Sequence, residues 1–145
     1  METMKGRVAV VTGAGSGIGK ALSLAFAAEG AKVVLADVED EALAATRTEI
    51  ETLGAQVLAV KTDVTDENSV AALCAATLET FGGVNILCNN AGVGGGGLVK
   101  NQQLVDWKWV IDVSLWGVIH GLHHFLPHLI AVSYTHLTLP TNREV

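Results

Sequence analysis

Four short apolar runs alternate with longer segments of mixed polarity along this chain. Each run is nearly continuous in Val, Leu, Ile and Ala instead of alternating with polar residues, which is typical of parallel strands buried on both faces. The sequence therefore predicts four such strands, at residues 8–11, 33–36, 57–60 and 84–88.

The segments between the runs carry apolar residues at helical spacing. The clearest helix follows the third run, and we expect Thr65 to cap its first turn and Gly82 to end it. Its apolar face comprises Val70, Leu73, Cys74, Thr77, Leu78 and Phe81.

Three further helices have weaker patterns. The fourth extends from about residue 103 to residue 130, where Gly117 and Gly121 on one stripe allow a close approach to the sheet. The second covers residues 39–53, with a stripe of Leu43, Thr46, Ile50 and Leu53. The first follows the first run, with one apolar face formed by Ile18, Leu22, Ala25 and Phe26.

Strand and helix alternate four times, which predicts a doubly wound α/β domain with a parallel sheet, the Rossmann fold. Because crossovers between parallel strands are right-handed, we expect the strand order 3-2-1-4. The apolar run at 84–88 then lies at a sheet edge, where it promotes aggregation. We therefore expect a domain over residues 1–131 that is truncated after its fourth strand and helix.

The composition fits one globular domain, because 50% of the 145 residues are hydrophobic and 17% are charged. A net charge of −6 argues against a nucleic-acid-binding surface. The chain contains no run of about 18 apolar residues, so we expect no membrane span. The first residues lack the apolar core of a signal peptide. Cys74 and Cys88 fit no metal or redox spacing. These features favour a cytoplasmic protein without nucleic-acid or membrane partners.

A glycine-rich segment joins the first strand to the first helix. Its spacing fits G-x-x-x-G-x-G rather than the commoner G-x-G-x-x-G. Glycines allow a sharp turn close to phosphate groups, and the N–H groups that begin a helix face the negative charge. An ordinary loop is the alternative, but the flanking strand and helix favour a site for a dinucleotide pyrophosphate. Its candidate residues are Gly13, Gly15, Ser16, Gly17, Ile18 and Gly19.

Asp37 directly follows the second strand. An acid at this place accepts hydrogen bonds from the adenosine ribose and repels a 2′-phosphate, so it favours NAD over NADP. Neither Ser16 nor Val38 offers a cation to such a phosphate. The alternative is a solvated loop acid beside Glu39 and Asp40.

Two further segments follow strands, Asp63-Val64 after the third and residues 89–92 after the fourth. With the glycine-rich segment and Asp37, in this order and spacing, they resemble the short-chain dehydrogenase/reductase family over about residues 5–131. The resemblance implies that Asp63 and Val64 hold the adenine ring. It also implies that Asn90, Ala91 and Gly92 line the cofactor, although Asn89-Asn90 alone would fit a simple turn.

The fourth helix departs from this family at one catalytic position. Residues 113–117, V-S-L-W-G, resemble the family pattern V-N-L-x-G, whose Asn belongs to a catalytic tetrad and holds a water in a proton relay. Ser114 stands at that position, and its hydroxyl donates and accepts hydrogen bonds but is shorter than an amide. Ser114 is therefore either a relay residue or a small packing residue bonded to its own helix.

The other tetrad residues of the family are a Ser and a Tyr-x-x-x-Lys pair, in which the Tyr is the acid/base. We find no counterpart here, since Tyr134 is followed at the fourth position by Thr138. Residues 132–141 match one translated frame of a transposon-based sequencing adapter. We therefore expect residues 132–145 to be a non-native tail.

Histidines at positions 120, 124 and 128 recur every four residues, as in a metal-binding ladder. Eight helical residues span about 12 Å, so these three side chains cannot share one ion. We expect no metal site.

The resemblance implies an oxidoreductase that transfers hydride between nicotinamide and an alcohol or ketone, with this chain as an N-terminal part. We expect NAD as the cofactor, with NADP less favoured, and a small-molecule alcohol or ketone as the substrate. The parent would be a homo-oligomer with its fourth helix between subunits. The alternative is a non-catalytic dinucleotide-binding module that has lost its tetrad.

Overall fold

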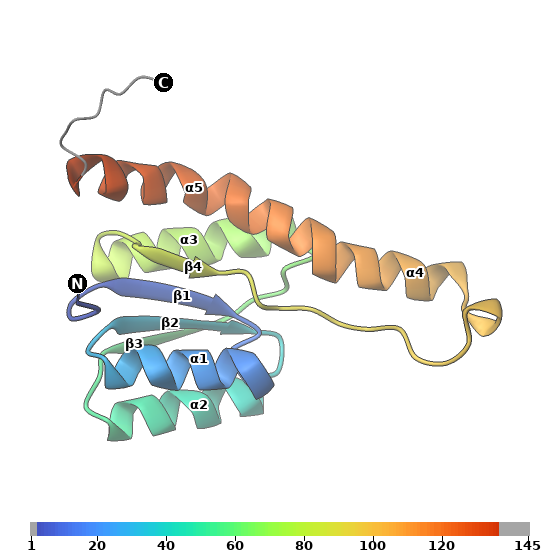
Figure 1. Ribbon diagram of the computed structural model, residues 1–145, viewed down its shortest axis with the longest axis horizontal. Coiled ribbons are helices and arrows are strands. Elements are labelled where there is room, and N and C mark those ends of the chain that lie inside the picture. The colour runs from blue at the N-terminus through green and yellow to red at the C-terminus, as the bar shows by residue number, and fades with distance from the viewer. Residues whose placement is uncertain (1–2, 137–145) are drawn as a thin grey trace.

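The computed structural model describes the backbone of residues 3–136 and the side chains of residues 3–132. Its sheet contains β1 (Val8–Thr12), β2 (Lys32–Asp37), β3 (Val57–Lys61) and β4 (Ile86–Cys88). All neighbouring strands pair in parallel, in the order β3-β2-β1-β4 (Figure 1). The predicted doubly wound fold and its strand order are confirmed.

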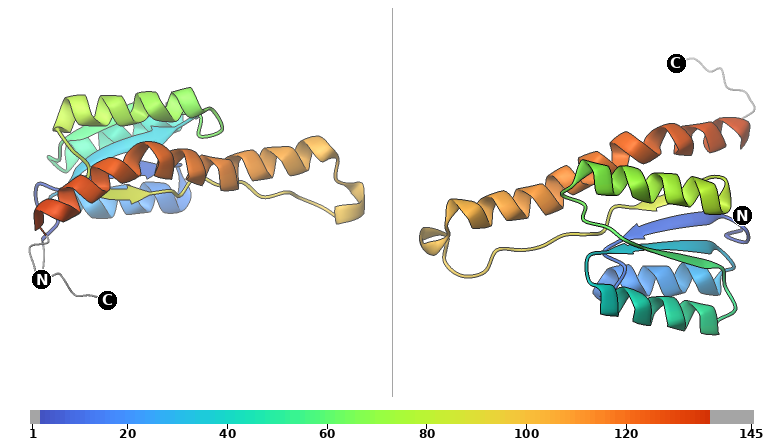
Figure 2. Two further views of the ribbon diagram at one scale, coloured as in Figure 1. Left: turned by 90° about the horizontal axis from the view of Figure 1, so that it is seen from above. Right: turned by 180° about the vertical axis from the view of Figure 1, so that it is seen from behind.

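Two layers of helices enclose the sheet. Helices α1 (Gly17–Ala28) and α2 (Asp40–Thr52) cover one face, and α3 (Glu67–Phe81) and α5 (Gly117–His136) cover the other (Figure 2). Between β4 and α5 lie an extended loop, a short helix η1 (Val99–Asn101), α4 (Leu104–Ile111) and a π-helical turn η2 (Asp112–Trp116). Helix α4 projects beyond the sheet (Figure 1). None of the helices described is long and apolar enough to cross a membrane.

The two central strands fill the core from both faces. Val10 and Val34 pack toward α3 and Phe125 of α5, whereas Val11 and Leu35 pack toward α1 and α2. The alternation follows from the pleat of a strand, which points successive side chains to opposite faces. This core is why β1 and β2 read along the sequence as continuous apolar runs.

The four predicted strands are present, but the prediction that all are buried is wrong for β3 and β4. Their residues are half-buried or exposed, because each pairs with one neighbour only within the described chain. Strand β4 is also shorter than predicted, because it begins at Ile86. Val84 is buried but lies ahead of the strand. The Asn85 side chain there accepts a hydrogen bond from Val8 N at 2.8 Å and ends the ladder.

The predicted apolar face of α1 is correct only in part, since Phe26 packs against the core. Ile18 is 73% exposed and Ala25 is exposed, while the buried residues are Gly19, Ser23 and Ala27. These three small residues recur every four positions and therefore share one side of the helix. Small side chains let α1 approach β1 closely, so residue size rather than hydrophobicity determines its buried face.

Helix α3 confirms the predicted face, but its cap differs. Val70, Leu73, Cys74 and Thr77 are buried, and Gly82 ends the helix in the left-handed conformation at φ +79°. The N-cap is Asp66 rather than Thr65, because its side chain accepts a hydrogen bond from Asn68 N.

The predicted fourth helix is divided into α4, η2 and α5. The π turn inserts one residue into the helical ladder around Ser114, which a pattern of apolar positions does not reveal. Beyond it, α5 continues to His136 instead of ending near residue 130. The expected non-native tail begins inside this helix, and its residues 137–145 lie outside the described part of the chain.

Candidate nucleotide-binding site

A cleft of about 510 Å³ opens at the carboxyl ends of the strands. Ligands bind at this edge of open α/β sheets because the loops that follow neighbouring strands diverge there. The segments after β1, β2, β3 and β4 all contribute to its wall. The predicted site residues that line it are Gly13, Ser16, Asp37, Asp63, Val64, Asn90, Ala91 and Gly92.

The other predicted loop residues support the cleft from behind or at its rim. Gly13 turns the chain at φ +66°, where a side chain is strained. A Cβ atom on Gly19 would run into the carbonyl group of Gly13, so helix and loop pack together only without one. Gly15 and Gly17 lie between them, and the Ile18 side chain is exposed beside the loop.

Helix α1 begins at this loop without a capping side chain. Ser16 is its N-cap residue in an extended conformation, but the Ser16 hydroxyl makes no capping hydrogen bond. The first-turn N–H groups of a helix need partners, and an anion can supply them. The residues present therefore fit the pyrophosphate of a dinucleotide.

Asn90 and Thr12 join the glycine-rich loop to the end of β4. Asn90 Nδ2 donates to Thr12 O at 3.0 Å, and the Thr12 hydroxyl accepts from the N–H groups of Asn90 and Ala91, each at 3.0 Å. The same hydroxyl donates to Cys88 O at 3.4 Å. Asn90 is therefore part of a junction between two strands rather than a simple turn.

Asp37 has two backbone partners on different segments. Its Oδ2 accepts from Gly15 N at 2.8 Å, and its Oδ1 accepts from Glu39 N at 3.0 Å. The residue is half-buried, unlike the exposed Glu39 and Asp40. These bonds fix the carboxylate at the edge of the cleft and differ from those of a freely solvated loop acid.

The segment after β3 forms a tight turn. Asp63 Oδ1 accepts from Thr65 N at 2.9 Å and from Thr65 Oγ1 at 2.7 Å, while Asp63 N donates to Ser69 Oγ at 3.0 Å. Val64 is buried against Gly117, as the predicted close approach of the fourth helix requires. Together these contacts hold the backbone of residues 63–65 along the wall of the cleft.

Ser114 does not bond to its own helix, contrary to one of the two interpretations. Its Oγ donates to Val93 O at 3.2 Å and accepts from Val93 N at 3.3 Å. The π turn directs Ser114 toward the loop after β4. The hydroxyl thus fastens the extended loop beside the cleft, and its only hydrogen is used by Val93 O.

Two of the histidines that recur along the fourth helix have separate partners. His120 Nδ1 lies 2.7 Å from Val64 O and therefore carries a proton, because a carbonyl group only accepts. His124 Nε2 lies 3.4 Å from Glu67 Oε1, and His123 lies nearby, with the three potential ligand atoms within 4.8 Å. Ligands of a tetrahedral zinc lie about 3.3 Å apart. The absence of a metal site stays a prediction.

Several cleft residues were not identified from the sequence. Thr62 and Thr65 flank the predicted Asp63-Val64 pair, so their position after a strand was a usable signal. Trp109 and Val113 come from α4 and η2, which only the course of the fourth helix brings to the cleft. The full set of unpredicted lining residues is Val38, Thr62, Thr65, Val93, Trp109 and Val113.

Comparison with known proteins identifies relatives along most of the chain. An uncharacterized oxidoreductase of Thermotoga maritima is 44% identical over 79% of this chain and 44% of its own length. The 1-deoxy-11-beta-hydroxypentalenate dehydrogenase of Streptomyces exfoliatus is 42% identical over 86% of this chain and 46% of its own. The chain spans about half the length of the curated relatives it matches.

Solved structures give the same result. The crystal structure of a short chain dehydrogenase/reductase from Burkholderia phymatum in complex with NAD has a TM-score of 0.88 and 46% identity. The match covers 91% of this chain and 47% of that one. The sequence model of the short chain dehydrogenases matches residues 7–136, so the chain belongs to the short-chain dehydrogenase family.

Proposed function

We propose that this chain binds NAD for an oxidoreductase that transfers hydride between nicotinamide and an alcohol or ketone substrate. The family supports an oxidoreductase with a nicotinamide dinucleotide and a small-molecule substrate. The observation that carries the proposal is the single cleft on which the segments after all four strands meet. NAD bound there would supply the hydride acceptor, and the residues of the cleft would bind and orient it.

Two features of the cleft match the pyrophosphate and the adenosine ribose of a dinucleotide. The uncapped start of α1 offers N–H groups to the phosphate oxygens. Asp37, held by Gly15 N and Glu39 N, presents its remaining lone pairs to the ribose hydroxyls and repels a 2′-phosphate. We therefore propose that NAD is preferred over NADP.

The remaining lining residues have proposed roles on either side of the pyrophosphate. Asp63 and Val64 border the adenine ring, and Asn90, Ala91 and Gly92 border the nicotinamide half. The junction of Asn90 with Thr12 keeps this second segment at a fixed distance from the phosphate-binding loop. The cleft therefore holds the cofactor between loops that are tied to one sheet.

A non-catalytic dinucleotide-binding module is the second candidate function. The observation that favours it is the commitment of the Ser114 hydroxyl to Val93, which leaves one acceptor lone pair and no donor for a proton relay. The test uses the full-length protein of the source gene, in which binding of NAD without formation of NADH from a panel of primary and secondary alcohols supports this candidate. Formation of NADH supports the oxidoreductase.

Calorimetric titration of the chain with NAD and with NADP tests the cofactor proposal. We expect NAD to bind more tightly than NADP, and Asp37→Ala to weaken NAD binding about tenfold, the equivalent of one hydrogen bond to a charged group. Glu51→Ala is the control, because Glu51 is an exposed carboxylate that pairs with Arg47 on α2 and does not line the cleft. Tighter binding of NADP by the unaltered chain contradicts the role given to Asp37.

We also propose that α5 packs against a second copy of the protein. Leu122, Leu126 and Ile130 recur at helical spacing and are 45%, 43% and 56% exposed. An apolar stripe of this kind is typical of a helix that is covered in an assembly. Leu126→Glu should lower the mass measured by light scattering from an oligomer toward that of one chain.

A further inference from the structure

We propose that Thr46, on α2, is a positioning residue that sets the preference of the cofactor site for a ribose without a 2′-phosphate. The inference rests on the proposed function, because Thr46 acts through Gly15 and Asp37. It assigns a part in nucleotide selection to a helix that lies behind the cleft and does not line it.

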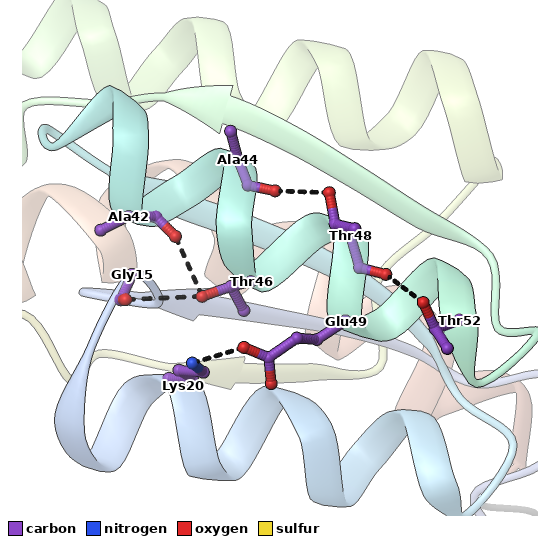
Figure 3. A network of polar contacts seen from close by, with 8 residues as sticks. All are labelled: Gly15, Lys20, Ala42, Ala44, Thr46, Thr48, Glu49 and Thr52. Atoms are coloured by element: carbon purple, nitrogen blue, oxygen red, sulfur yellow. Dashed lines mark hydrogen bonds and ion pairs between the residues drawn. The ribbon is translucent and has the colours of Figure 1, made fainter.

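The Thr46 hydroxyl reaches beyond its own helix (Figure 3). Its side chain is fully buried, and Oγ1 lies 3.1 Å from Ala42 O and 3.4 Å from Gly15 O. A hydroxyl has one hydrogen, so Thr46 shares it between the carbonyl of its own helix and that of the glycine-rich loop. The second bond joins residues 31 positions apart in the sequence.

Gly15 is held on both sides of its peptide backbone. Its N–H group donates to Asp37 Oδ2 at 2.8 Å, and its carbonyl group accepts from Thr46. The contact is close, because a Cβ atom on Gly15 would lie 2.9 Å from both Asp37 Oδ2 and Ala42 Cβ. Gly15 is thus confined between the Asp37 carboxylate and α2. The hydrogen bond from Thr46 fixes the direction of the Gly15 carbonyl group.

Other threonines of α2 differ from Thr46 in this respect. Thr48 and Thr52 are exposed and donate to carbonyl groups of α2 itself, at 3.1 Å and 2.9 Å (Figure 3). Lys20 and Glu49 join α1 to α2 at 2.6 Å, but this ion pair is partly exposed and contributes little. The buried connection from α2 to the loop therefore runs through Thr46.

Loss of the hydroxyl should be transmitted to the ribose site. Without it, the Gly15 carbonyl group loses its buried donor, and the peptide can reorient. Reorientation weakens the hydrogen bond from Gly15 N to Asp37, so the carboxylate is less fixed where it meets the ribose. Discrimination against a 2′-phosphate depends on that fixed charge and should decrease.

The test compares Thr46→Val with Thr46→Ser in titrations with NAD and NADP. We expect Thr46→Val to weaken NAD binding about three- to tenfold, to lower the ratio of NAD to NADP affinity, and Thr46→Ser to restore both. Thr77→Val is the matched control, because Thr77 is equally buried and its hydroxyl donates only to Leu73 O of its own helix. Thr46→Ala replaces Thr46→Val if the latter fails to fold.

Two comparisons separate the inference from the proposed function. Failure of the unaltered chain to bind NAD overturns the proposed function and the inference with it. NAD binding by the unaltered chain, with Thr46→Val indistinguishable from Thr77→Val, overturns the inference alone. In an Asp37→Ala background, Thr46→Val should not change the affinity ratio further, and an undiminished effect there also overturns it.

A measurement without nucleotide gives an independent result. Hydrogen exchange of the Gly15 amide reports its bond to Asp37, and we expect exchange several-fold faster in Thr46→Val than in Thr77→Val. Equal exchange rates in the two variants contradict a positioning role for Thr46.

Discussion

Asn90 Nδ2 donates a hydrogen bond to Thr12 O at 3.0 Å and so joins the ends of β4 and β1 at the cleft. Thr12 is 5% exposed, and its hydroxyl makes one donated and two accepted bonds in return. Beyond the last backbone hydrogen bonds between β1 and β4, these side-chain hydrogen bonds hold the two segments together. The two loops that face the proposed cofactor are thereby fixed relative to each other.

Asn90→Ala should therefore affect both stability and nucleotide binding. Loss of this partly buried bond lowers the free energy of unfolding by about 1–3 kcal/mol, and the loosened loops weaken NAD binding. Asn85→Ala is the matched control, because Asn85 binds Val8 N at the opposite end of β1. Urea unfolding should show a loss in both variants, whereas titration should show weaker NAD binding in Asn90→Ala only. Equal NAD affinities would contradict the role of the junction.

Gly19→Ala tests the packing of α1 against the loop. The added methyl group meets the carbonyl group of Gly13, so we expect a loss of about 1–3 kcal/mol in the free energy of unfolding. At Gly96 a Cβ atom would meet open space, and Gly96→Ala should change stability by less than about 0.5 kcal/mol. Thermal unfolding of the two variants gives the comparison, and equal melting temperatures count against the packing argument.

Ser114→Ala should release the loop that follows β4. Val93 loses the partners of both its N–H and its carbonyl group, so hydrogen exchange at the Val93 amide should become several-fold faster. Ser69→Ala removes the comparable bond to Asp63 N and serves as the control. Exchange in that control should change at Asp63 and not at Val93. An unchanged Val93 rate in Ser114→Ala would show that the bond does not hold the loop.

Both cysteines should react slowly with alkylating agents. Burial raises the pKa of the Cys74 and Cys88 thiols above the ordinary value, because a charged thiolate is poorly solvated inside the protein. At neutral pH the reactive thiolate is then scarcer than in a free cysteine, and the labelling rate should continue to rise above pH about 8.5. Mass spectrometry against a urea-unfolded sample measures this. Equal rates in the two samples would contradict it.

The sequence predicted those features that hydrophobicity and glycine spacing determine. The strands were recognisable because β1 and β2 are buried on both faces, and their order followed from right-handed crossovers. Gly13 and Asp37 were assigned to one dinucleotide site from the glycine spacing and from the acid that follows the second strand, and both line the cleft.

Features that depend on tertiary contacts were not predictable in this way. The buried face of α1 is formed by small residues, so Ile18 was wrongly placed against the sheet. The π turn around Ser114 leaves no mark in an apolar pattern, and its bond to Val93 depends on that turn. Thr46 looked like one position in a weak stripe, although its hydroxyl reaches another loop.

Nuclear magnetic resonance of the isotope-labelled chain during addition of NAD shows whether the nucleotide binds in this cleft. We expect amide shifts to change with NAD concentration in residues 13–19, at Asp37, in residues 63–64 and in residues 90–92. The amides of Val8 and Asn85, at the opposite end of the sheet, should stay unchanged. Shift changes confined to that opposite end, or none at saturating NAD, would contradict the assignment of this cleft as a nucleotide-binding site.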